Sequence, residues 1–264
     1  MTNEQSDLDV ALEAARAGAE VLRAMYGSDL TKQLKSSTDF ATEADEAAER
    51  AILDIVHSAR PRDGFVGEEL GRVETGSASR VWLVDPLCGT LNFAAETSSF
   101  CVNVALVVDG VTVAAAVSHP PSGEVYWADS DTFGIAGRNT SSAPASNALV
   151  DINADGPLDR PFVGAQLAAD PDFRARFNPR VESTTLALAW VATGHRLGYV
   201  TDGHHRGSVH FEAGVALCRA AGCIITDFDG SELHSGPGII AARDAESHAE
   251  LMRLVSRHRS AGAA

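Results

Sequence analysis

The chain has 264 residues, 45% apolar and 22% charged, which is typical of a folded globular protein with one large or two small domains. Its formal net charge of −15 argues against nucleic acid and anionic membrane surfaces as partners, because both require basic patches. No apolar run reaches the ~18 residues that span a bilayer, and the acidic N-terminal segment differs from a signal peptide, so we expect a cytoplasmic protein.

Two segments near the start of the chain carry apolar residues at helical spacing. They cover residues 7–26 and 43–59, and we predict an amphipathic helix in each. The polar segment 35–40 between them is typical of a hairpin or loop. The apolar run 81–84 predicts a short buried strand, which Asp85-Pro86 is expected to end before a loop.

A β-sheet is expected in the next part of the chain. The runs 101–108 and 111–117 flank Asp109-Gly110, and an Asp-Gly pair between two β-branched runs is a strong hairpin signal. Residues 124–128 are expected to add a third strand to this sheet. The segment 138–160 is rich in Asn, Ser, Ala, Asp and Pro, so we predict a domain boundary or surface linker there.

This boundary divides the chain into two predicted subdomains. The N-terminal α+β subdomain covers residues 1–140, and the C-terminal α/β subdomain covers residues 141–264. Helices and strands are expected to alternate in the second. The predicted helices cover 184–194, 211–221 and 244–257, and the predicted strands cover 224–226 and 238–242.

Three segments form a recognisable set of motifs. They are Gly67-Glu68-Glu69, the run WLVDPLCGTLNF over residues 82–93, and Ala213-Gly214 followed by RAAGCIITD over residues 219–227. Their order and spacing resemble the inositol monophosphatase family, and the resemblance covers nearly the whole chain. Supporting matches are Lys35-Ser36-Ser37, Asp39, Asp45 and Gly236-Pro237-Gly238. The resemblance implies an α/β fold, a layered αβαβα sandwich with two subdomains, and usually a homodimer.

The resemblance also implies a chemistry and a set of site residues. In the family, Mg²⁺ ions held by oxygen ligands polarise the phosphate and lower the pKa of an attacking water. Glu68, Asp85 and the carbonyl of Leu87 match metal-ligand positions. Thr90 and Asp45 match the pair that orients the water. The phosphate would bind to backbone N–H groups at a helix start, the phosphate cradle, which matches Gly89 and Thr90.

Several positions depart from the family pattern. The family has Asp-Pro-x-Asp-Gly-Thr, and here the second Asp is Cys88. The family's Trp-Asp pair falls at Val209 and His210, and its acidic residue that contacts the substrate hydroxyls falls at Thr201. Thiol and imidazole ligands suit zinc better than magnesium. Two such changes at facing positions indicate a change of chemistry.

From these changes we hypothesise a metal-free enzyme that uses no cofactor. His210 would activate Cys88 as a nucleophile for acyl transfer or cyclisation, and Asp85 or Glu68 would orient the imidazole. The N–H groups of the phosphate cradle would form an oxyanion hole. The substrate would be a thioester, either a small molecule or a chain on a carrier protein, as in Dieckmann-type chain release. The catalytic residues of this hypothesis are Cys88, His210, Asp85 and Thr90.

Two alternatives stay open. The first is a metal-dependent phosphomonoesterase acting on an inositol, sugar or nucleotide phosphate, with Mg²⁺ at Glu68, Asp85, Leu87 and Asp45. The second is a catalytically inactive binding protein, which the same departures from the family pattern support.

Other polar and thiol side chains have structural explanations. We expect Cys101, Cys218 and Cys223 to be small buried hydrophobes, because a cytosolic chain seldom uses cysteines as disulfides. The pair His204-His205 looks like a metal site, but it lies in a polar stretch that is more often solvated, and adjacent residues rarely point the same way.

Overall fold

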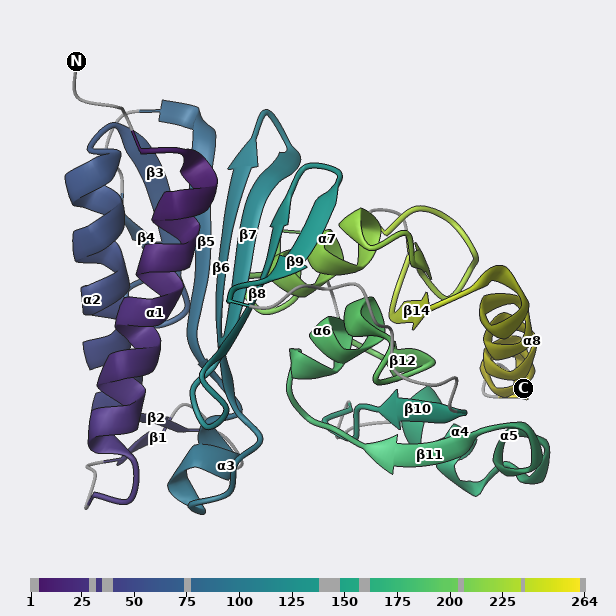
Figure 1. Ribbon diagram of the computed structural model, residues 1–264. Coiled ribbons are helices and arrows are strands. Elements are labelled where there is room, and N and C mark those ends of the chain that lie inside the picture. Colours follow the sequence, from purple (N-terminus) through teal and green to yellow (C-terminus); the bar gives the residue numbers. More distant parts are fainter. Residues whose placement is uncertain are drawn as a thin grey trace. The chain divides into compact units, whose positions relative to one another are not determined.

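The computed structural model describes residues 5–28, 32–34, 40–73, 77–137, 148–156, 162–203, 207–233 and 236–261. These residues form two compact units, each described here by itself (Figure 1). The first unit takes the described parts of Met1–Asn139 together with Thr184–Leu186 and Gly207–Leu217, and the second takes the remainder. The subdomain boundary at residue 140 stays a prediction.

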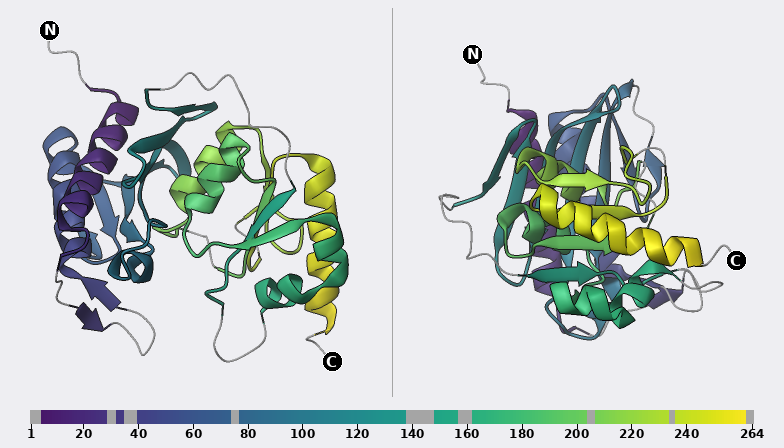
Figure 2. Two further views of the ribbon diagram at one scale, coloured as in Figure 1. Left: turned by 60° about the horizontal axis from the view of Figure 1, so that its bottom comes forward. Right: turned by 90° about the vertical axis from the view of Figure 1, so that its right-hand side faces the viewer.

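Two long helices form one layer of the first unit. They are α1 (Asp7–Met25) and α2 (Glu43–Ala59), and they confirm the two helices predicted from apolar spacing. They lie side by side in Figures 1 and 2 and pack on each other and on the strands of a sheet. A capping box starts α2: the Thr42 hydroxyl oxygen accepts the Ala44 N–H, and the Asp45 carboxylate accepts the Thr42 N–H. This box fixes Asp45 at the start of the helix.

A seven-stranded sheet forms the other layer. Its strands are β3 (Asp63–Gly67), β4 (Arg72–Val73), β5 (Ser77–Cys88), β6 (Cys101–Val108), β7 (Val111–His119), β8 (Glu124–Asp129) and β9 (Thr132–Ile135). The order is β4-β3-β5-β6-β7-β8-β9, and only the β3–β5 pair is parallel. The predicted hairpin and third strand are confirmed as β6, β7 and β8. Asp109 (φ 50°) and Gly110 (φ 82°) form the turn with the positive φ angles of a type I′ hairpin.

Strand β5 is longer than the predicted strand at 81–84. It pairs regularly with β6 as far as Asp85, the register then shifts, and Cys88 pairs with Cys101. Pro86 has no N–H to donate and falls in this irregular stretch. The prediction that Asp85-Pro86 ends the strand was wrong, because β6 continues beside it. The irregular end of β5 presents the site residues.

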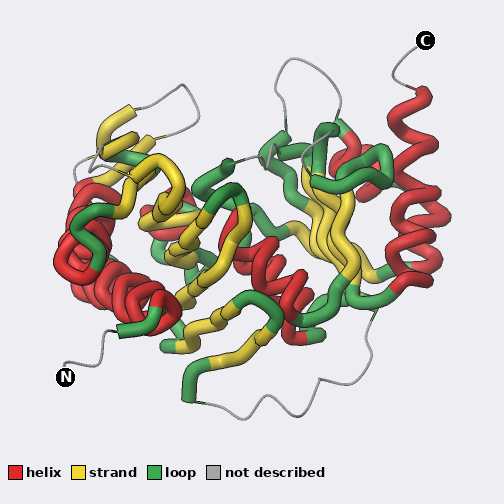
Figure 3. Tube along the Cα trace, turned by 90° about the horizontal axis from the view of Figure 1, so that it is seen from above, coloured by secondary structure: helices red, strands yellow, loops and turns green. Residues whose placement is uncertain are grey.

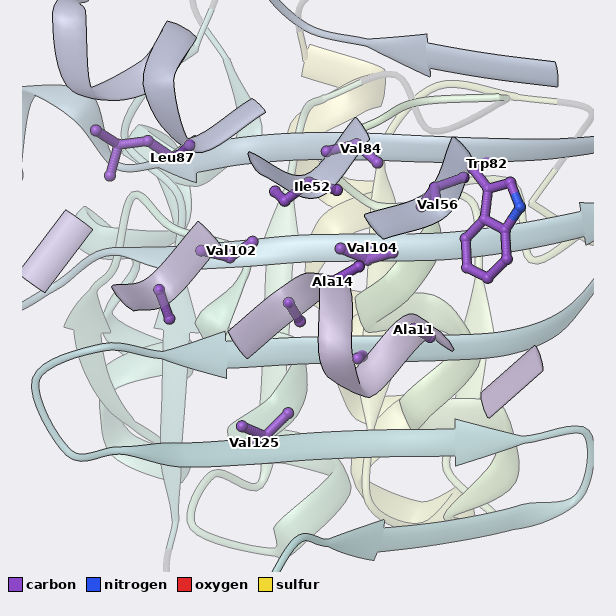
Figure 4. Close-up of a cluster of buried hydrophobic side chains, with 14 of the residues drawn as sticks. Ala11, Ala14, Ile52, Val56, Trp82, Val84, Leu87, Val102, Val104 and Val125 are labelled. Carbon is purple, nitrogen blue, oxygen red and sulfur yellow. The ribbon is translucent and has the colours of Figure 1, made fainter. Parts of the chain in front are cut away.

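The core of the first unit lies between the two helices and the sheet. Figure 4 shows apolar side chains of α1, α2, β5 and β6 directed into this layer. Fully buried members include Ala11, Ala14, Ile52, Trp82, Val84, Val102 and Val104. Full burial of a side chain such as that of Ile52 contributes about 1.5–3 kcal/mol. The core therefore supports β5, on which the site is built.

Two short strands complete the regular structure before α2. Strand β1 (Lys32–Leu34) pairs in antiparallel fashion with β2 (Phe40–Thr42). The predicted polar loop between them, with Lys35-Ser36-Ser37 and Asp39, lies outside the described residues.

The second unit is built on a five-stranded sheet. Its strands are β10 (Leu149–Ile152), β11 (Asn178–Val181), β12 (Gly198–Thr201), β13 (Ile224–Thr226) and β14 (Ile239–Ala242), in the order β11-β10-β12-β14-β13. Its helices include α4 (Val163–Ala169), α5 (Pro171–Arg176) and α8 (Ala245–Ala261). In Figure 3, α8 is the red helix leading to the C-terminus, beside the yellow strands of this sheet.

Most elements predicted for the later part of the chain are confirmed. The predicted helices correspond to α6 (Leu186–Thr193), α7 (Glu212–Ala220) and α8, and the predicted strands to β13 and β14. The linker predicted at 138–160 was wrong where β10 lies, because Val150 and Ile152 are buried and β10 pairs with two strands. Residues 138–147 and 157–160 of that segment lie outside the described residues.

No helix formed by the described residues is long and apolar enough to cross a membrane.

Candidate active site

Asp85 stands at the centre of the candidate site, where regular pairing of β5 with β6 ends. Its side chain is fully buried. One carboxylate oxygen accepts the backbone N–H of Leu87 at 3.1 Å, and the other lies 2.8 Å from Nδ1 of His210. The irregular end of β5 thus holds one carboxylate oxygen and leaves the other oxygen to the imidazole of His210.

Glu68 approaches the same point from the loop that follows the neighbouring strand β3. Its backbone N–H donates to the carbonyl of Val84 at 3.1 Å, which anchors the residue to β5. Its carboxylate lies 3.8 Å from Nδ1 of His210. Glu68, Asp85 and His210 each offer a ligand atom, and these atoms all lie within 4.8 Å of one another.

A buried carboxylate on α2 holds the loop that carries Glu68. Both oxygens of Glu49 accept backbone N–H groups, from Glu69 and Leu70, at 2.8 Å each. Burial raises the pKa of Glu49, although the two hydrogen bonds oppose this. A Cβ on Gly67 would lie 1.8 Å from a Glu49 oxygen. Glycine at 67 therefore makes room for the carboxylate that fixes the loop.

The imidazole of His210 lies between two carboxylates. Burial pushes its pKa down, but the negative charge and hydrogen bond of Asp85, with further negative charge from Glu68, outweigh burial and raise the pKa to about 10. The His210 side chain is still 44% exposed, so solvent reaches the imidazole. Positive charge is strongly favoured at this point of the site, as expected where carboxylates converge.

Asp45 and Thr90, the pair predicted to orient a water, are in contact. The Thr90 hydroxyl lies 3.0 Å from an Asp45 oxygen and 3.1 Å from the carbonyl of Leu87, and it can donate to either. The other Asp45 oxygen accepts from the N–H and hydroxyl of Thr42 at 2.7 Å each. Asp45 is fully buried, and burial raises its pKa to about 6 despite these bonds. It can therefore take up a proton near neutral pH.

A glycine makes the turn from β5 into the short helix α3 (Thr90–Ala94). Gly89 has a φ of 102°, and a Cβ there would lie 2.7 Å from the Ser99 carbonyl oxygen and from the Thr184 side chain. The predicted phosphate cradle, Gly89 and Thr90, thus stands at a helix start. Its role in binding phosphate stays a prediction.

Cys88 is a buried thiol that contacts Thr185 and Cys101. Its sulfur lies 3.4 Å from both the backbone N–H and the hydroxyl of Thr185. A hydrogen bond with Cys101 and burial raise the pKa of Cys88 well above its usual range. Among the described residues, His210 forms hydrogen bonds with Asp85 and Ser208 and none with Cys88. The thiol–imidazole pair required for acyl transfer is therefore not formed.

The other predicted site residue, Thr201, ends β12 in the second unit. Its hydroxyl accepts the N–H of Gly203 at 3.1 Å. Its contact with substrate stays a prediction. The pair His204-His205 lies outside the described residues.

The sequence analysis missed two residues that shape the site. Glu49 follows Asp45 by four residues on one helix, so helical spacing was a usable signal for it. Thr185 approaches Cys88 across 97 residues of sequence, and no local pattern marks such a contact.

Comparison with known proteins gives consistent matches over almost the whole chain. The model of the inositol monophosphatase family matches residues 3–260. An inositol-1-monophosphatase of Caulobacter vibrioides is 31% identical over 249 residues, which cover 88% of this chain and 94% of that protein. The Nus factor SuhB of Escherichia coli K12 is 30% identical over 250 residues, which cover 89% and 90%.

Solved structures match the fold. The extragenic suppressor protein suhB of Bartonella henselae has a TM-score of 0.82 and 26% identity, over 94% of this chain and 97% of that one. An IMPase of Thermotoga maritima, at 22% identity, has a TM-score of 0.80 over 95% and 96% of the two chains. The predicted fold class, a mixed α/β fold with two sheets of the inositol monophosphatase type, is confirmed.

Two expectations are corrected by these matches. The hypothesis of acyl transfer or cyclisation by a Cys88–His210 pair, with a thioester or carrier-bound substrate, was wrong: the matching family is one of phosphatases, and among the described residues the thiol is bonded to Thr185 while the imidazole is bonded to Asp85. The expectation of no cofactor was also wrong. The family chemistry uses Mg²⁺, and Glu68, Asp85 and His210 form a group able to hold a metal ion.

Proposed function

This chain belongs to the inositol monophosphatase family, and on that premise we propose that it is a metal-dependent phosphomonoesterase. The observation that carries the proposal is the convergence of Glu68, Asp85 and His210, whose ligand atoms lie within 4.8 Å of one another. The substrate class is an inositol, sugar or nucleotide phosphate, a small molecule whose phosphate would be drawn to a bound cation.

The donor set of this group fits a divalent cation. Two carboxylates and one imidazole are common metal ligands, and the strong preference for positive charge at His210 indicates an unbalanced negative charge from the carboxylates. We infer that Glu68, Asp85 and His210 would hold the ion, together with the carbonyl of Leu87, which the family resemblance implies as a further ligand. When bound, such an ion would supply Lewis-acid polarisation of the phosphate and would lower the pKa of a water molecule.

The remaining site residues have roles that follow from their own contacts. The Thr90 hydroxyl is bonded to Asp45, so a water that donates to Thr90 can pass its proton through that hydroxyl to the carboxylate. Because the pKa of Asp45 is raised to about 6, the carboxylate is ionised at neutral pH and still basic enough to accept the proton. The N–H groups of Gly89 and Thr90 would bind the phosphate oxygens.

The proposal is tested by phosphate release from a panel of phosphomonoesters, with a divalent cation and with EDTA. We expect cation-dependent release that EDTA abolishes, and a loss of about 100-fold in Asp85→Asn through weakened metal binding. The matched control is Asp54→Asn, which changes an exposed carboxylate on α2 outside the site. Undiminished release in EDTA, or full activity in Asp85→Asn, would refute the proposal.

We further propose, from the family resemblance alone, that the protein is a homodimer. Light scattering during size-exclusion chromatography tests this, and a mass near 27.7 kDa, that of one chain, would contradict it.

A further inference from the structure

We propose that His210 is a metal ligand that sets ion preference, so that this site selects a transition ion such as Zn²⁺ or Co²⁺ over Mg²⁺. The inference rests on the proposed function, because it names the ion class that serves the same site. It depends on an imidazole standing in a group otherwise made of oxygen donors, Glu68 and Asp85.

The position of the imidazole suits coordination. Its Nδ1 lies 2.8 Å from an Asp85 oxygen and 3.8 Å from a Glu68 oxygen. Ligand atoms bind such ions at about 2.0–2.2 Å, so donors around one ion stand about 3–4 Å from each other. The three side chains thus approach the spacing of one coordination shell with the ring nitrogen directed into it.

Local contacts fix the imidazole at this point. The backbone N–H of His210 donates to the Ser208 hydroxyl at 3.3 Å, and the ring lies edge-on to Phe211, with 6.5 Å between centroids. Asp85 is itself held by the backbone of Leu87. Since Leu87 holds Asp85 and the ring nitrogen is bonded to Asp85, an ion bound beside this carboxylate would meet a nitrogen donor.

Coordination chemistry then gives the selectivity. Mg²⁺ is a hard ion that demands oxygen ligands and keeps several waters, whereas imidazole suits zinc and other transition ions. A nitrogen donor therefore raises the affinity for Zn²⁺ or Co²⁺ more than that for Mg²⁺. Cys88 adds nothing to this preference, because its sulfur faces Thr185 and Cys101 and is outside the ligand group.

The experiment measures metal binding, not turnover. The full chain is stripped with EDTA, dialysed and titrated with Zn²⁺ and with Mg²⁺ by calorimetry. Proton NMR of the Co²⁺-loaded protein is recorded as well, because a coordinated imidazole gives a strongly shifted, exchangeable N–H resonance. We compare wild type with His210→Asp, His210→Ala and the control His57→Asp, which changes an exposed histidine near the end of α2.

We expect the ratio of Zn²⁺ to Mg²⁺ affinity to fall by about 10-fold or more in His210→Asp, because an oxygen donor replaces the nitrogen. The shifted resonance should disappear in both His210 variants and persist in His57→Asp. A ratio unchanged within about twofold, or a shifted resonance that survives His210→Ala, would overturn the inference. The proposed function fails separately, if no metal supports phosphate release while the binding ratio still responds to His210.

Discussion

The carboxylate of Glu49 fills the space that a side chain on Gly67 would occupy. A Cβ at position 67 would lie 1.8 Å from one Glu49 oxygen and 2.3 Å from its carboxyl carbon. The loop that carries Glu68 therefore packs around the buried carboxylate of Glu49. We expect Gly67→Ala to displace this acid and lower the free energy of unfolding by about 1–3 kcal/mol, measured in urea, the usual cost of overpacking a core.

A double-mutant cycle separates this clash from other effects of the alanine. Glu49→Ala alone should also destabilise the protein, because the N–H groups of Glu69 and Leu70 lose their acceptors. In the double variant the steric conflict is gone, so the combined loss should be smaller than the sum of the two single losses. Strictly additive losses would show that Glu49 and Gly67 do not interact.

The Thr90 hydroxyl should be required for turnover. It is bonded to Asp45, and Thr90→Ala removes the group proposed to orient and deprotonate the water. We expect kcat for phosphate release to fall by about 100-fold or more, while Thr90→Ser, which restores a hydroxyl, recovers most of the rate. Thr132→Ala, at an exposed position in β9, is the control. Equal rates in Thr90→Ala and wild type would contradict the assigned role.

Asp170 should make stability depend on pH in the acid range. Burial pushes the pKa of Asp170 up, but hydrogen bonds from the N–H of Phe173, from His258 and from the N–H of Asp172 outweigh this and lower it. Because the folded pKa lies below the unfolded value of about 3.9, the stabilisation is present above that pH. It is lost as the pH falls through the folded pKa.

The matching experiment compares two neighbouring acids. Asp170→Asn keeps an N-cap oxygen but removes the charge that pairs with Arg257 and His258, so it should lower the free energy of unfolding by about 0.5–1 kcal/mol at pH 7 and by less at pH 3. Asp172→Asn should cost about 0.5 kcal/mol or less at either pH, since its side chain is 60% exposed and pairs at the surface with Arg257. A loss in Asp170→Asn that is independent of pH would contradict the prediction.

Local patterns predicted much of this fold, and long-range contacts account for what they missed. Apolar spacing placed α1 and α2, and the Asp109-Gly110 turn placed the β6–β7 hairpin, because each signal lies within a few residues. The neighbours of Asp85 could not be predicted from local patterns alone. His210 lies 125 residues away in sequence, and only the family resemblance brought the two side chains together in advance.

The chemistry of Cys88 could not be predicted in the same way. Cys88 occupies the position of a metal-binding Asp in the family motif, which indicated that the thiol faces the metal site. The reactivity of the thiol, however, depends on which atoms it contacts. Those contacts are Thr185, far along the chain, and Cys101 on the next strand. Thr185 donates to the sulfur, but burial and the hydrogen bond with Cys101 outweigh this and favour a neutral thiol, so a residue that looks like a nucleophile in sequence is a buried packing residue in the structure.

The most reactive cysteine should instead be Cys223, in the second unit. A hydrogen bond with Cys218 and the nearby guanidinium of Arg243, 3.8 Å from the sulfur, lower the pKa of Cys223 to about 7 against the effect of burial. Cys223 is partly exposed, whereas Cys88 is buried and its pKa is raised. We therefore expect limiting iodoacetamide to label Cys223 first, and Cys223→Ser to remove this fast labelling.

Labelling is followed by intact-mass spectrometry and peptide mapping at two pH values. With a pKa of about 7, the thiolate fraction of Cys223 falls roughly 10-fold between pH 8 and pH 6, and the labelling rate should fall with it. Cys88→Ser is the matched control: it should leave both the fast labelling and the phosphate release of the enzyme close to wild type, because neither depends on that thiol. First labelling at Cys88, or loss of phosphate release in Cys88→Ser, would show that the thiol takes part in the chemistry of the site.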